Sequence, residues 1–304
     1  MDLIIIGGGT AGLTAAIYAA RSGISVTVIE RAVCGGQVLA TSGIDNYPGM
    51  PGVSGGGFAF ALYNQVKDLG VNILYETITS TSLTNSKKII TTSKNSYKTK
   101  AVIIATGAKP KKLGVPGEEK WIGQGVAFCA TCDGALYKGK NVAVIGGGNV
   151  ATQDAVLLSG LCHTVTVIHR SNNFSAEGVQ LSQAKSKENI KFLTNFEVKE
   201  IIGDSTLNKL ILESKLNGQS VEIPVDGVFI AIGAEPDNSV FASEIILDKK
   251  GYIVAGEDCK TNLPGVFVAG DTRTKNIRQI VTAAADGCVA ALSAYSYINN
   301  PKEG

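Results

Sequence analysis

Short runs of uninterrupted apolar residues, separated by glycine-rich turns and by stretches of helical composition, recur along this chain. The first run, Leu3–Ile6, lacks polar alternation and predicts a strand buried on both faces of a parallel sheet. A helix is predicted over 11–22, which ends before Gly23, and a second buried strand over 25–29, which Glu30 closes. This order of strand, helix and strand predicts a βαβ unit and therefore an α/β fold.

Three glycines lie between the first predicted strand and the first helix, in the spacing G-x-G-x-x-G formed by Gly7, Gly9 and Gly12. Such glycines let the backbone turn and approach a pyrophosphate, whose charge the helix N-terminus stabilises. Glu30, after the second strand, can accept hydrogen bonds from both hydroxyls of an adenosine ribose. An ordinary glycine turn of a parallel sheet is the alternative, but the complete order of elements favours a dinucleotide site.

The same order of strand, glycine turn, helix and strand recurs in the middle of the chain. Its parts are a strand over 141–145, the turn Gly146-Gly147-Gly148 with Ala151, a helix to about Gly160, and a strand over 164–168 that ends at His169 and Arg170. Two dinucleotide-type units in one chain predict two nucleotide cofactors. Hydride transfer between a nicotinamide and a flavin is the usual reason for such a pair.

Two further buried strands, each ending at a glycine, precede stretches with proline at 113–117 and 234–238. We interpret these stretches as linkers that cross between domains. The predicted fold class is α/β, with two Rossmann-like dinucleotide-binding domains, the second inserted into the first. The first domain is expected to comprise 1–112 and 241–304, and the inserted domain 113–240. The last part is predicted to hold a strand over 266–269, the exit Gly270-Asp271 and a long helix over 279–298.

Composition excludes several classes of protein. The 304 residues carry a formal net charge of +2, which is too small for a nucleic-acid-binding surface. Hydrophobic residues make up 44% and charged residues 18%, enough to bury a sizeable core. The apolar start lacks a positive n-region, and no stretch approaches the ~18 apolar residues that span a bilayer. We therefore expect a cytoplasmic protein that binds neither nucleic acid nor membranes.

Cys129 and Cys132 form the one C-x-x-C pair among six cysteines, and Asp133 follows directly. Such a pair can close a small disulfide at the first turn of a helix, where the reactive thiolate is favoured. A carboxyl group at Asp133 could move the proton that thiol–disulfide exchange requires. A zinc site would need two more ligands, and the chain holds only His163 and His169 and no second C-x-x-C. Structural cysteines are the other alternative, but the position between two dinucleotide motifs favours redox chemistry.

The other cysteines are given a simpler interpretation. Cys162 and Cys288 have apolar or small neighbours and are expected in the core. Cys34 precedes Gly35-Gly36-Gln37 and is expected to pack rather than react.

Several motifs, taken together, point to one family. They are the Gly7–Gly12 turn, Gly35-Gly36-Gln37, Asn46-Tyr47-Pro48-Gly49, Ala105-Thr106-Gly107-Ala108, Gly114-Val115-Pro116-Gly117, Cys129-Ala130-Thr131-Cys132-Asp133-Gly134, Gly146-Gly147-Gly148, Gly270-Asp271 and Arg278-Gln279. On these residues the chain resembles the low-molecular-weight thioredoxin reductases over essentially its full length. The C-A-T-C-D-G string is highly specific in that context.

The resemblance implies a homodimer that reduces thioredoxin and whose second domain swivels about two linkers. It implies that FAD binds the first domain through Gly7, Gly9, Thr10, Ala11, Gly12, Glu30, Arg31, Gly35, Gly36, Gln37, Asn46, Thr106, Gly107, Gly270, Asp271, Arg278, Gln279 and Ile280. A nicotinamide nucleotide would bind the second domain through Gly146, Gly148, Asn149, Ala151, His169 and Arg170. By the same resemblance, Asp271 would touch the ribityl chain, and the N-terminus of the following helix would lie near the flavin pyrimidine ring. Cys132 would be the sulfur nearer the flavin, Cys129 would attack thioredoxin, and Asp133 would be the acid and base.

One segment departs from the family pattern. The NADPH-binding pattern is H-R-R-x-x-x-R, whereas this chain has His169 and Arg170 followed by Ser171 and Ser175 in place of the other two arginines. Serine supplies neither the charge nor the bidentate fork that grips a 2′-phosphate. No acid stands at the position of His169, where one would favour NADH. The electron donor is therefore left open between NADPH, NADH and ferredoxin, which some relatives use.

Two alternatives keep the flavin but change the function. One is an FAD-dependent dithiol oxidase that passes electrons from Cys129 and Cys132 to oxygen. The other is a non-catalytic flavin redox sensor that binds a partner. A flavoprotein subunit of a peroxide reductase is less favoured, because no thioredoxin-like extension precedes Met1 in this sequence.

Overall fold

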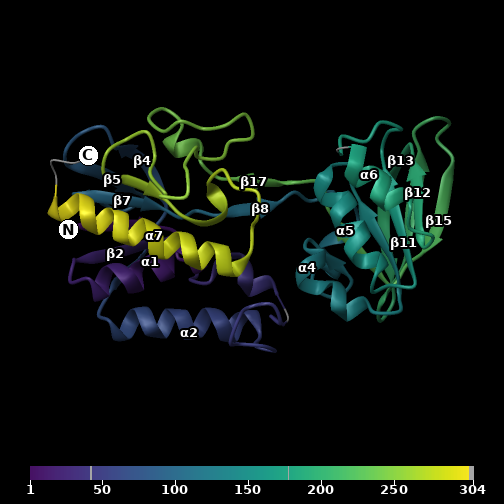
Figure 1. The fold of residues 1–304 in the computed structure, drawn as a ribbon, viewed down its shortest axis with the longest axis horizontal. Coiled ribbons are helices and arrows are strands. Elements are labelled where there is room, and N and C mark those ends of the chain that lie inside the picture. Colours follow the sequence, from purple (N-terminus) through teal and green to yellow (C-terminus); the bar gives the residue numbers. More distant parts are fainter. Residues whose placement is uncertain (42, 177, 301–304) are drawn as a thin grey trace. The chain divides into compact units, whose positions relative to one another are not determined.

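The computed structural model describes residues 1–41, 43–176 and 178–300, and the chain folds into two units (Figure 1). The first unit comprises Met1–Lys109 and Glu235–Gly304, and the second comprises Pro110–Ala234. The chain thus crosses between units a few residues before the positions expected from the sequence. Packing accounts for the later difference, because Val240 packs on a core cluster of the first unit and the buried Asn238 is hydrogen-bonded there to the carbonyl of Thr272.

A five-stranded parallel sheet forms the centre of the first unit, in the order β18-β7-β1-β2-β3. Its strands are β1 (Leu3–Ile6), β2 (Val26–Glu30), β3 (Asn72–Tyr75), β7 (Ala101–Ile104) and β18 (Val266–Val268). Every residue of β1 is buried, because Leu3 and Ile5 face one core cluster while Ile4 and Ile6 face another. The prediction of a strand covered on both faces is confirmed.

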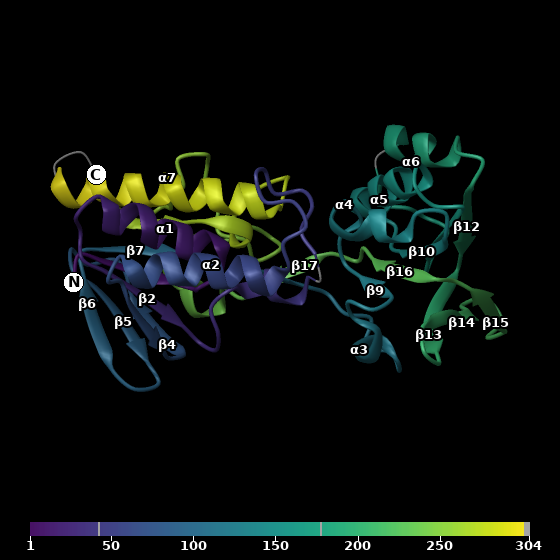
Figure 2. The same cartoon turned by 90° about the horizontal axis from the view of Figure 1, so that it is seen from below.

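Three α-helices belong to this unit in the part of the chain that the structure describes. They are α1 (Thr10–Arg21), α2 (Gly55–Asp68) and α7 (Ile280–Asn299), and α1 lies between the other two (Figure 2). The helix α7 begins one residue after the predicted start and ends one residue after the predicted end. A smaller antiparallel sheet of β4 (Ile78–Ser82), β5 (Lys88–Thr92) and β6 (Ser96–Thr99) completes the unit, together with the short 3-10 helices η1 (Gly36–Ala40), η3 (Ser239–Phe241) and η4 (Gly270–Thr272).

The second unit repeats the design, with a parallel sheet in the order β12-β11-β10-β16-β9. Its strands are β9 (Val126–Ala127), β10 (Asn141–Ile145), β11 (Thr164–His169), β12 (Ile190–Thr194) and β16 (Gly227–Ile230). The helices are α3 (Glu118–Trp121), α4 (Ala130–Asp133), α5 (Asn149–Ser159) and α6 (Gly178–Lys185), with the 3-10 helix η2 (Gly134–Tyr137). Two Rossmann-like sheets in one chain confirm the predicted fold class.

Two smaller sheets involve the second unit and the crossings. An antiparallel sheet of β13 (Phe196–Gly203), β14 (Leu207–Ser214) and β15 (Ser220–Pro224) covers one face, where Leu210 and Leu212 join the core around Trp121. At the crossings, β8 (Ala108–Pro110) pairs with β17 (Ala234–Pro236). Within the described residues, none of the helices combines the length and apolar character needed to cross a membrane.

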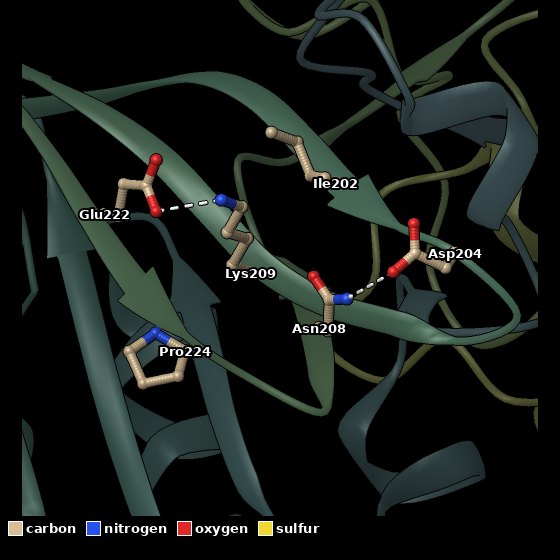
Figure 3. A pocket seen from close by; sticks show the side chains of 6 residues that line it. All are labelled: Ile202, Asp204, Asn208, Lys209, Glu222 and Pro224. Carbon is tan, nitrogen blue, oxygen red and sulfur yellow. Dashed lines mark hydrogen bonds and ion pairs between the residues drawn. The ribbon is translucent and has the colours of Figure 1, made fainter.

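An open groove lies on the antiparallel sheet of the second unit (Figure 3). It is lined by Ile202, Asp204, Asn208, Lys209, Glu222 and Pro224. Lys209 Nζ donates to Glu222 Oε2 at 2.9 Å, so these opposite charges neutralise each other. None of the lining residues belongs to the predicted site, and we assign the groove no role.

Candidate active site

The first glycine turn is built by backbone contacts that exclude a side chain. Gly7 has a φ of 108°, and a Cβ there would overlap the carbonyl of Ala105. A Cβ on Gly12 would overlap the carbonyl of Gly7, so this glycine lets α1 pack directly on the turn. The helix starts at Thr10, and its N-cap Gly9 has no side chain to satisfy the first N–H groups. These N–H groups are therefore available to an anion.

A second glycine loop lies against this turn. Gly35 N donates to the carbonyl of Gly8 at 2.8 Å, and Gly36 has a φ of 66°. A Cβ on Gly36 would lie 3.1 Å from Gly9 Cα. The two loops therefore form a cradle of bare backbone at the carboxyl end of β1, where a pyrophosphate is expected in this kind of sheet.

Glu30 is oriented by the backbone around it. Its Oε2 accepts the N–H of Gly8 at 2.7 Å, and its Oε1 accepts the N–H of Ala32 at 2.9 Å. A carboxylate oxygen has a second lone pair, so the side chain can still accept ribose hydroxyls. Arg31, another predicted cofactor residue, forms an exposed ion pair with Asp237 at 3.0 Å.

Asp271 holds an unsatisfied acceptor. Its Oδ1 is buried and has no hydrogen-bond partner in the part of the chain that the structure describes. Burial raises the pKa of this carboxyl, and the nearby charges of Lys275 and Arg278 oppose that rise. A buried acceptor without a partner is unfavourable unless a ligand supplies a donor. A ribityl hydroxyl is such a donor, and the residues therefore fit FAD.

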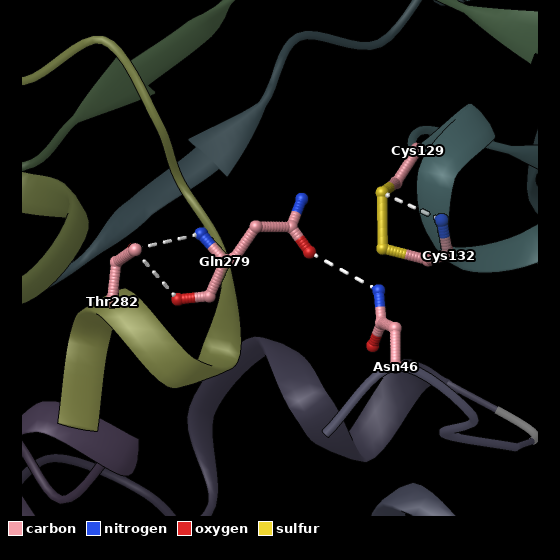
Figure 4. The surroundings of a disulfide bond; sticks show 5 residues. All are labelled: Asn46, Cys129, Cys132, Gln279 and Thr282. Atoms are coloured by element: carbon pink, nitrogen blue, oxygen red, sulfur yellow. Dashed lines mark hydrogen bonds between the residues drawn. A yellow bond between two sulfur atoms is a disulfide. The ribbon is translucent and has the colours of Figure 1, made fainter. Parts of the chain in front are cut away.

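The segments around Asp271 are joined by side chains from distant parts of the chain. Thr106 and Thr272 Oγ1 both hydrogen-bond Asn238 Oδ1, at 3.1 and 2.7 Å. Gln279 caps α7 together with Thr282, while its Oε1 accepts Asn46 Nδ2 at 3.2 Å (Figure 4). The predicted residues Asn46, Thr106 and Gln279 are thus held by contacts within the first unit.

Arg278 is held by stacking as well as by hydrogen bonds. Its guanidinium carbon lies 4.2 Å from the centroid of the Tyr252 ring, and its Nε donates to the carbonyl of Asp271 at 3.4 Å. Gly270, with a φ of 80°, turns the chain into this segment, and a Cβ there would lie 2.8 Å from Ala11 Cβ. The turn after β18 therefore fits closely against α1.

Sequence reasoning missed a buried charge cluster beside this turn. Asp286 is bound by Arg273 Nη2 at 2.8 Å and by Lys275 Nζ at 2.8 Å, and all three side chains are almost wholly buried. One signal was present in the sequence, because Asp286 is the single charged residue of α7, which consists mostly of apolar and small residues. A lone carboxylate in such a helix indicates a buried partner of opposite charge. The sequence around Asn238 contained no such indication that its side chain is buried and hydrogen-bonded.

In the second unit a disulfide joins Cys129 and Cys132, whose Cα atoms lie 5.3 Å apart (Figure 4). Cys129 is the N-cap of α4, and its Sγ accepts the backbone N–H of Cys132 at 3.2 Å. Burial raises the pKa of the half-buried Asp133 carboxyl, and the charge of Asp133 contributes to the raised pKa of Tyr137. A carboxyl group that holds its proton more tightly is suited to proton transfer near neutral pH.

The second glycine turn is covered by the loop that carries the two serines. The backbone N–H groups of Ser175 and Ala176 donate to the carbonyl of Gly147 at 2.8 and 3.1 Å, and Ser175 Oγ donates to the same oxygen at 3.3 Å. Ser171 Oγ donates to the carbonyl of Asn173 at 3.1 Å. The ring of His169 lies against Gly147, where a Cβ would overlap it. Both serine hydroxyls are therefore engaged with the protein's own backbone.

The helix N-terminus at this turn remains of the anion-binding type. Gly148 is the N-cap of α5, and this glycine has no side chain with which to cap the helix. Arg170 is exposed and contributes to the lowered pKa of Glu197, so it lies near that carboxylate. The structure thus brings Gly146, Gly148 and His169 together at one turn.

The other cysteines differ in burial. Cys162 is buried, as expected, and so are Cys34 and Cys259. Cys34 Sγ lies 4.0 Å from Tyr75 Oη, in the packing that the sequence indicated. Cys288 is only partly buried, so the expectation of a core position is wrong. It lies near Tyr18 of α1 and contributes to the raised pKa of that tyrosine.

Comparison with known proteins places this geometry in a family. Residues 1–287 match the family described as pyridine nucleotide-disulphide oxidoreductase. The chain is 41% identical to a "34.2 kDa protein in rubredoxin operon" of Clostridium pasteurianum, covering 98% of this chain and 97% of that protein. It is 41% identical to a thioredoxin reductase of Listeria innocua, covering 99% and 95%.

A solved structure gives the same result. Thioredoxin reductase from Streptococcus pyogenes is 38% identical, with a TM-score of 0.93 and coverage of 98% of both chains. The chain therefore belongs to the pyridine nucleotide-disulphide oxidoreductases and, within them, to the low-molecular-weight thioredoxin reductase family of flavoprotein disulfide reductases.

Proposed function

We propose that this protein is a homodimeric thioredoxin-disulfide reductase of the cytoplasm, in which electrons pass from FAD through the Cys129–Cys132 pair to thioredoxin. The disulfide at C-A-T-C-D-G, followed by a half-buried Asp133, is the observation that carries the proposal. Four cysteines that form no disulfide, in a chain of this size, favour a reducing compartment.

We assign FAD to the first unit. The bare backbone at Gly9 and Gly36 and the N-terminus of α1 would receive the pyrophosphate, and Glu30 the ribose. The buried Oδ1 of Asp271 would accept a ribityl hydroxyl. When bound, FAD supplies the reducing equivalents that open a disulfide to two thiols. Asn46 and Gln279, which hydrogen-bond each other at the start of α7, would hold this end of the cofactor site in place.

The exchange with thioredoxin follows from the two sulfurs and Asp133. Cys129, as thiolate, attacks one sulfur of thioredoxin's disulfide and forms a mixed disulfide, while the other thioredoxin sulfur leaves and takes a proton from Asp133. Cys132 then passes its proton to Asp133 and attacks Cys129 Sγ. This step restores the Cys129–Cys132 disulfide and releases the second thioredoxin sulfur, which takes from Asp133 the proton that Cys132 gave up and so leaves as a thiol. Two electrons and two protons have moved to thioredoxin. The N–H of Cys132, which already points at Cys129 Sγ, would stabilise the attacking thiolate.

For the electron donor, we propose that NADPH binds weakly. Two serines replace the arginines that would grip a 2′-phosphate, and both hydroxyls donate to backbone carbonyls, Ser171 to its own loop and Ser175 to the glycine turn. The glycine N-cap of α5, at the intact glycine turn, still supports binding of a pyrophosphate. NADH and reduced ferredoxin are the alternative donors, because neither requires a 2′-phosphate site.

Anaerobic titration of the FAD-loaded protein tests this proposal. NADPH, NADH and reduced ferredoxin are added in turn, with oxidised thioredoxin in excess, and flavin bleaching and thioredoxin thiols are followed together. The proposal expects at least one donor to bleach the flavin and yield thioredoxin thiols, and NADPH to saturate only at high concentration. Consumption of oxygen with no thioredoxin thiols would favour a dithiol oxidase. No turnover with any donor would favour a redox sensor.

A further inference from the structure

The charge cluster around Asp286 touches the proposed flavin site through backbone groups. Asp286 Oδ2 accepts the N–H of Gly270 at 2.9 Å, and Gly270 immediately precedes Asp271. Arg273 binds Asp286 with two nitrogens, Nε to Oδ2 at 2.9 Å and Nη2 to Oδ1 at 2.8 Å. The carboxylate therefore joins α7 to both sides of the turn that presents Asp271.

Lys275 extends the cluster to the start of α7. Its Nζ donates to Asp286 Oδ2 at 2.8 Å and to the carbonyl of Thr282 at 3.4 Å. Thr282 Oγ1 in turn accepts the N–H of Gln279 at 3.1 Å in the capping box. One buried carboxylate thus fixes the turn at Gly270 and, through Lys275, the first turn of α7.

The charges in this cluster do not cancel. Arg273 and Lys275 carry two positive charges against the single negative charge of Asp286, and each side chain is at most 8% exposed. Glu257 also approaches Arg273 Nη2, at 3.5 Å, but its side chain is 96% exposed and water screens it. The buried surroundings of Asp271 therefore hold an excess of positive charge that Asp286 limits.

We infer that Asp286, with Arg273 and Lys275, is a positioning residue that holds Asp271 for the flavin and sets the charge that the flavin meets. This inference rests on the proposed FAD site. Because a reduced flavin carries more negative charge than an oxidised flavin, the balance of buried charge at the site shifts its midpoint potential. Removing the anion and removing one cation must then shift the potential in opposite directions.

The experiment uses FAD-loaded protein and two variants with opposite charge changes. Asp286→Asn keeps an acceptor for Gly270 N–H but removes the negative charge, and Lys275→Met removes one positive charge. Glu257→Gln is the matched control, because it removes an exposed carboxylate that contacts the same arginine. The flavin midpoint potential is measured by dye-coupled reduction, and FAD affinity by titrating apoprotein and following flavin fluorescence.

We expect Asp286→Asn to raise the potential and Lys275→Met to lower it, each by at least a tenfold change in the ratio of reduced to oxidised flavin, or about 30 mV. FAD affinity should fall at least tenfold in Asp286→Asn, while Glu257→Gln leaves both quantities unchanged. If Asp286→Asn does not fold, the direction in which the flavin midpoint potential shifts in Lys275→Met tests the inference by itself. Shifts of the same sign, or none, would overturn the inference. If the wild-type protein fails to bind FAD, the proposed function fails instead.

Discussion

Asp133 controls the proton in the proposed exchange, and its burial gives a prediction about pH. Because burial raises the pKa of this carboxyl, it remains protonated to a higher pH than an exposed aspartate. The acid form is therefore present below the raised pKa and is lost as the pH rises through it. Asp133→Asn should slow thioredoxin reduction by about 100-fold and remove this alkaline fall in rate.

A stopped-flow measurement of thioredoxin reduction across pH 5–9 checks this prediction. The exposed Asp204 provides a control, and Asp204→Asn should leave both the rate and the pH profile unchanged. An Asp133→Asn protein with the wild-type profile would rule out Asp133 as the acid.

The two serines at the second turn give a prediction about nucleotide choice. Replacing Ser171 and Ser175 together by arginine would supply two cations beside the turn at Gly147, which the Ser175 hydroxyl now contacts. The KM for NADPH should fall at least about tenfold, because charge-assisted hydrogen bonds to a phosphate are strong. The KM for NADH, which lacks that phosphate, is the internal control. An unchanged KM for NADPH would disprove the prediction.

Some site residues could be found from sequence and others could not. Cys129, Cys132 and Asp133 lie in one short motif, and its spacing and its position between two glycine turns predicted a redox site there. Asn238 contacts Thr106 and Thr272, far from it in the sequence, and no local pattern marks it. Such a residue can be identified only from the folded structure, in which its hydrogen-bond partners lie next to it.

At the scale of elements, the contact between α1 and α7 depends on the absence of a side chain at Gly287. A Cβ there would overlap the carbonyl of Ala11. Gly287→Ala should therefore lower the free energy of unfolding by about 1–3 kcal/mol, although alanine favours a helix.

Gly56→Ala is the matched control for this substitution. It lies in α2 with nothing within 4 Å of an added Cβ and should stabilise the protein by up to about 1 kcal/mol. Thermal unfolding of both variants and of the wild type measures the two changes in the free energy of unfolding. A Gly287→Ala protein as stable as the wild type would show that α1 and α7 can move apart without a loss of stability.

The helix α5 carries a carboxyl group that links stability to pH. Burial raises the pKa of Asp154 from 3.8 to about 7, so between these values the folded chain holds a proton that the unfolded chain has lost. The contribution of Asp154 to stability should therefore fall as the pH rises from about 4 to about 7. Asp154→Asn should be more stable than the wild type at pH 8, by about 1–3 kcal/mol, and nearly equal at pH 4.

Unfolding midpoints at pH 4 and pH 8 test this prediction. The exposed Asp204 again gives the control variant, for which no such divergence is expected. Equal midpoints of Asp154→Asn and the wild type at pH 8 would contradict it.

The helices α1, α5 and α7 and the strands β1, β2, β10, β11 and β18 were predicted to within about two residues, because buried strands and capped helices leave strong local patterns. The helix α2 and the parallel strands β3 and β12 were not predicted. The antiparallel sheets were not predicted. In β15, for example, partly buried residues alternate with exposed ones, and Pro224 ends the strand. Its pairing with β14 depends on partners in the fold rather than on its own composition.

In the whole molecule, the repeated glycine turn predicted two dinucleotide-type units, and the two proline-containing stretches at 113–117 and 234–238 predicted that one is inserted into the other. The positions of the crossings were less predictable. Residues 235–240 have a linker composition, yet Val240 packs on the first unit and Asn238 is hydrogen-bonded within it. Tertiary packing, which local sequence does not report, therefore sets the boundary.

We propose that electrons leave the protein through Cys129 and Cys132, and a count of the thiols formed on thioredoxin tests this route. FAD-loaded protein is reduced anaerobically with one equivalent of dithionite, mixed with oxidised thioredoxin, and quenched with iodoacetamide for mass spectrometry. We predict that thioredoxin gains two alkylated cysteines for each Cys129–Cys132 disulfide that re-forms. Cys132→Ser should yield no doubly alkylated thioredoxin, because the exchange stops at the mixed disulfide with Cys129. Thioredoxin that stays oxidised, or becomes reduced equally well by Cys132→Ser, would contradict the account.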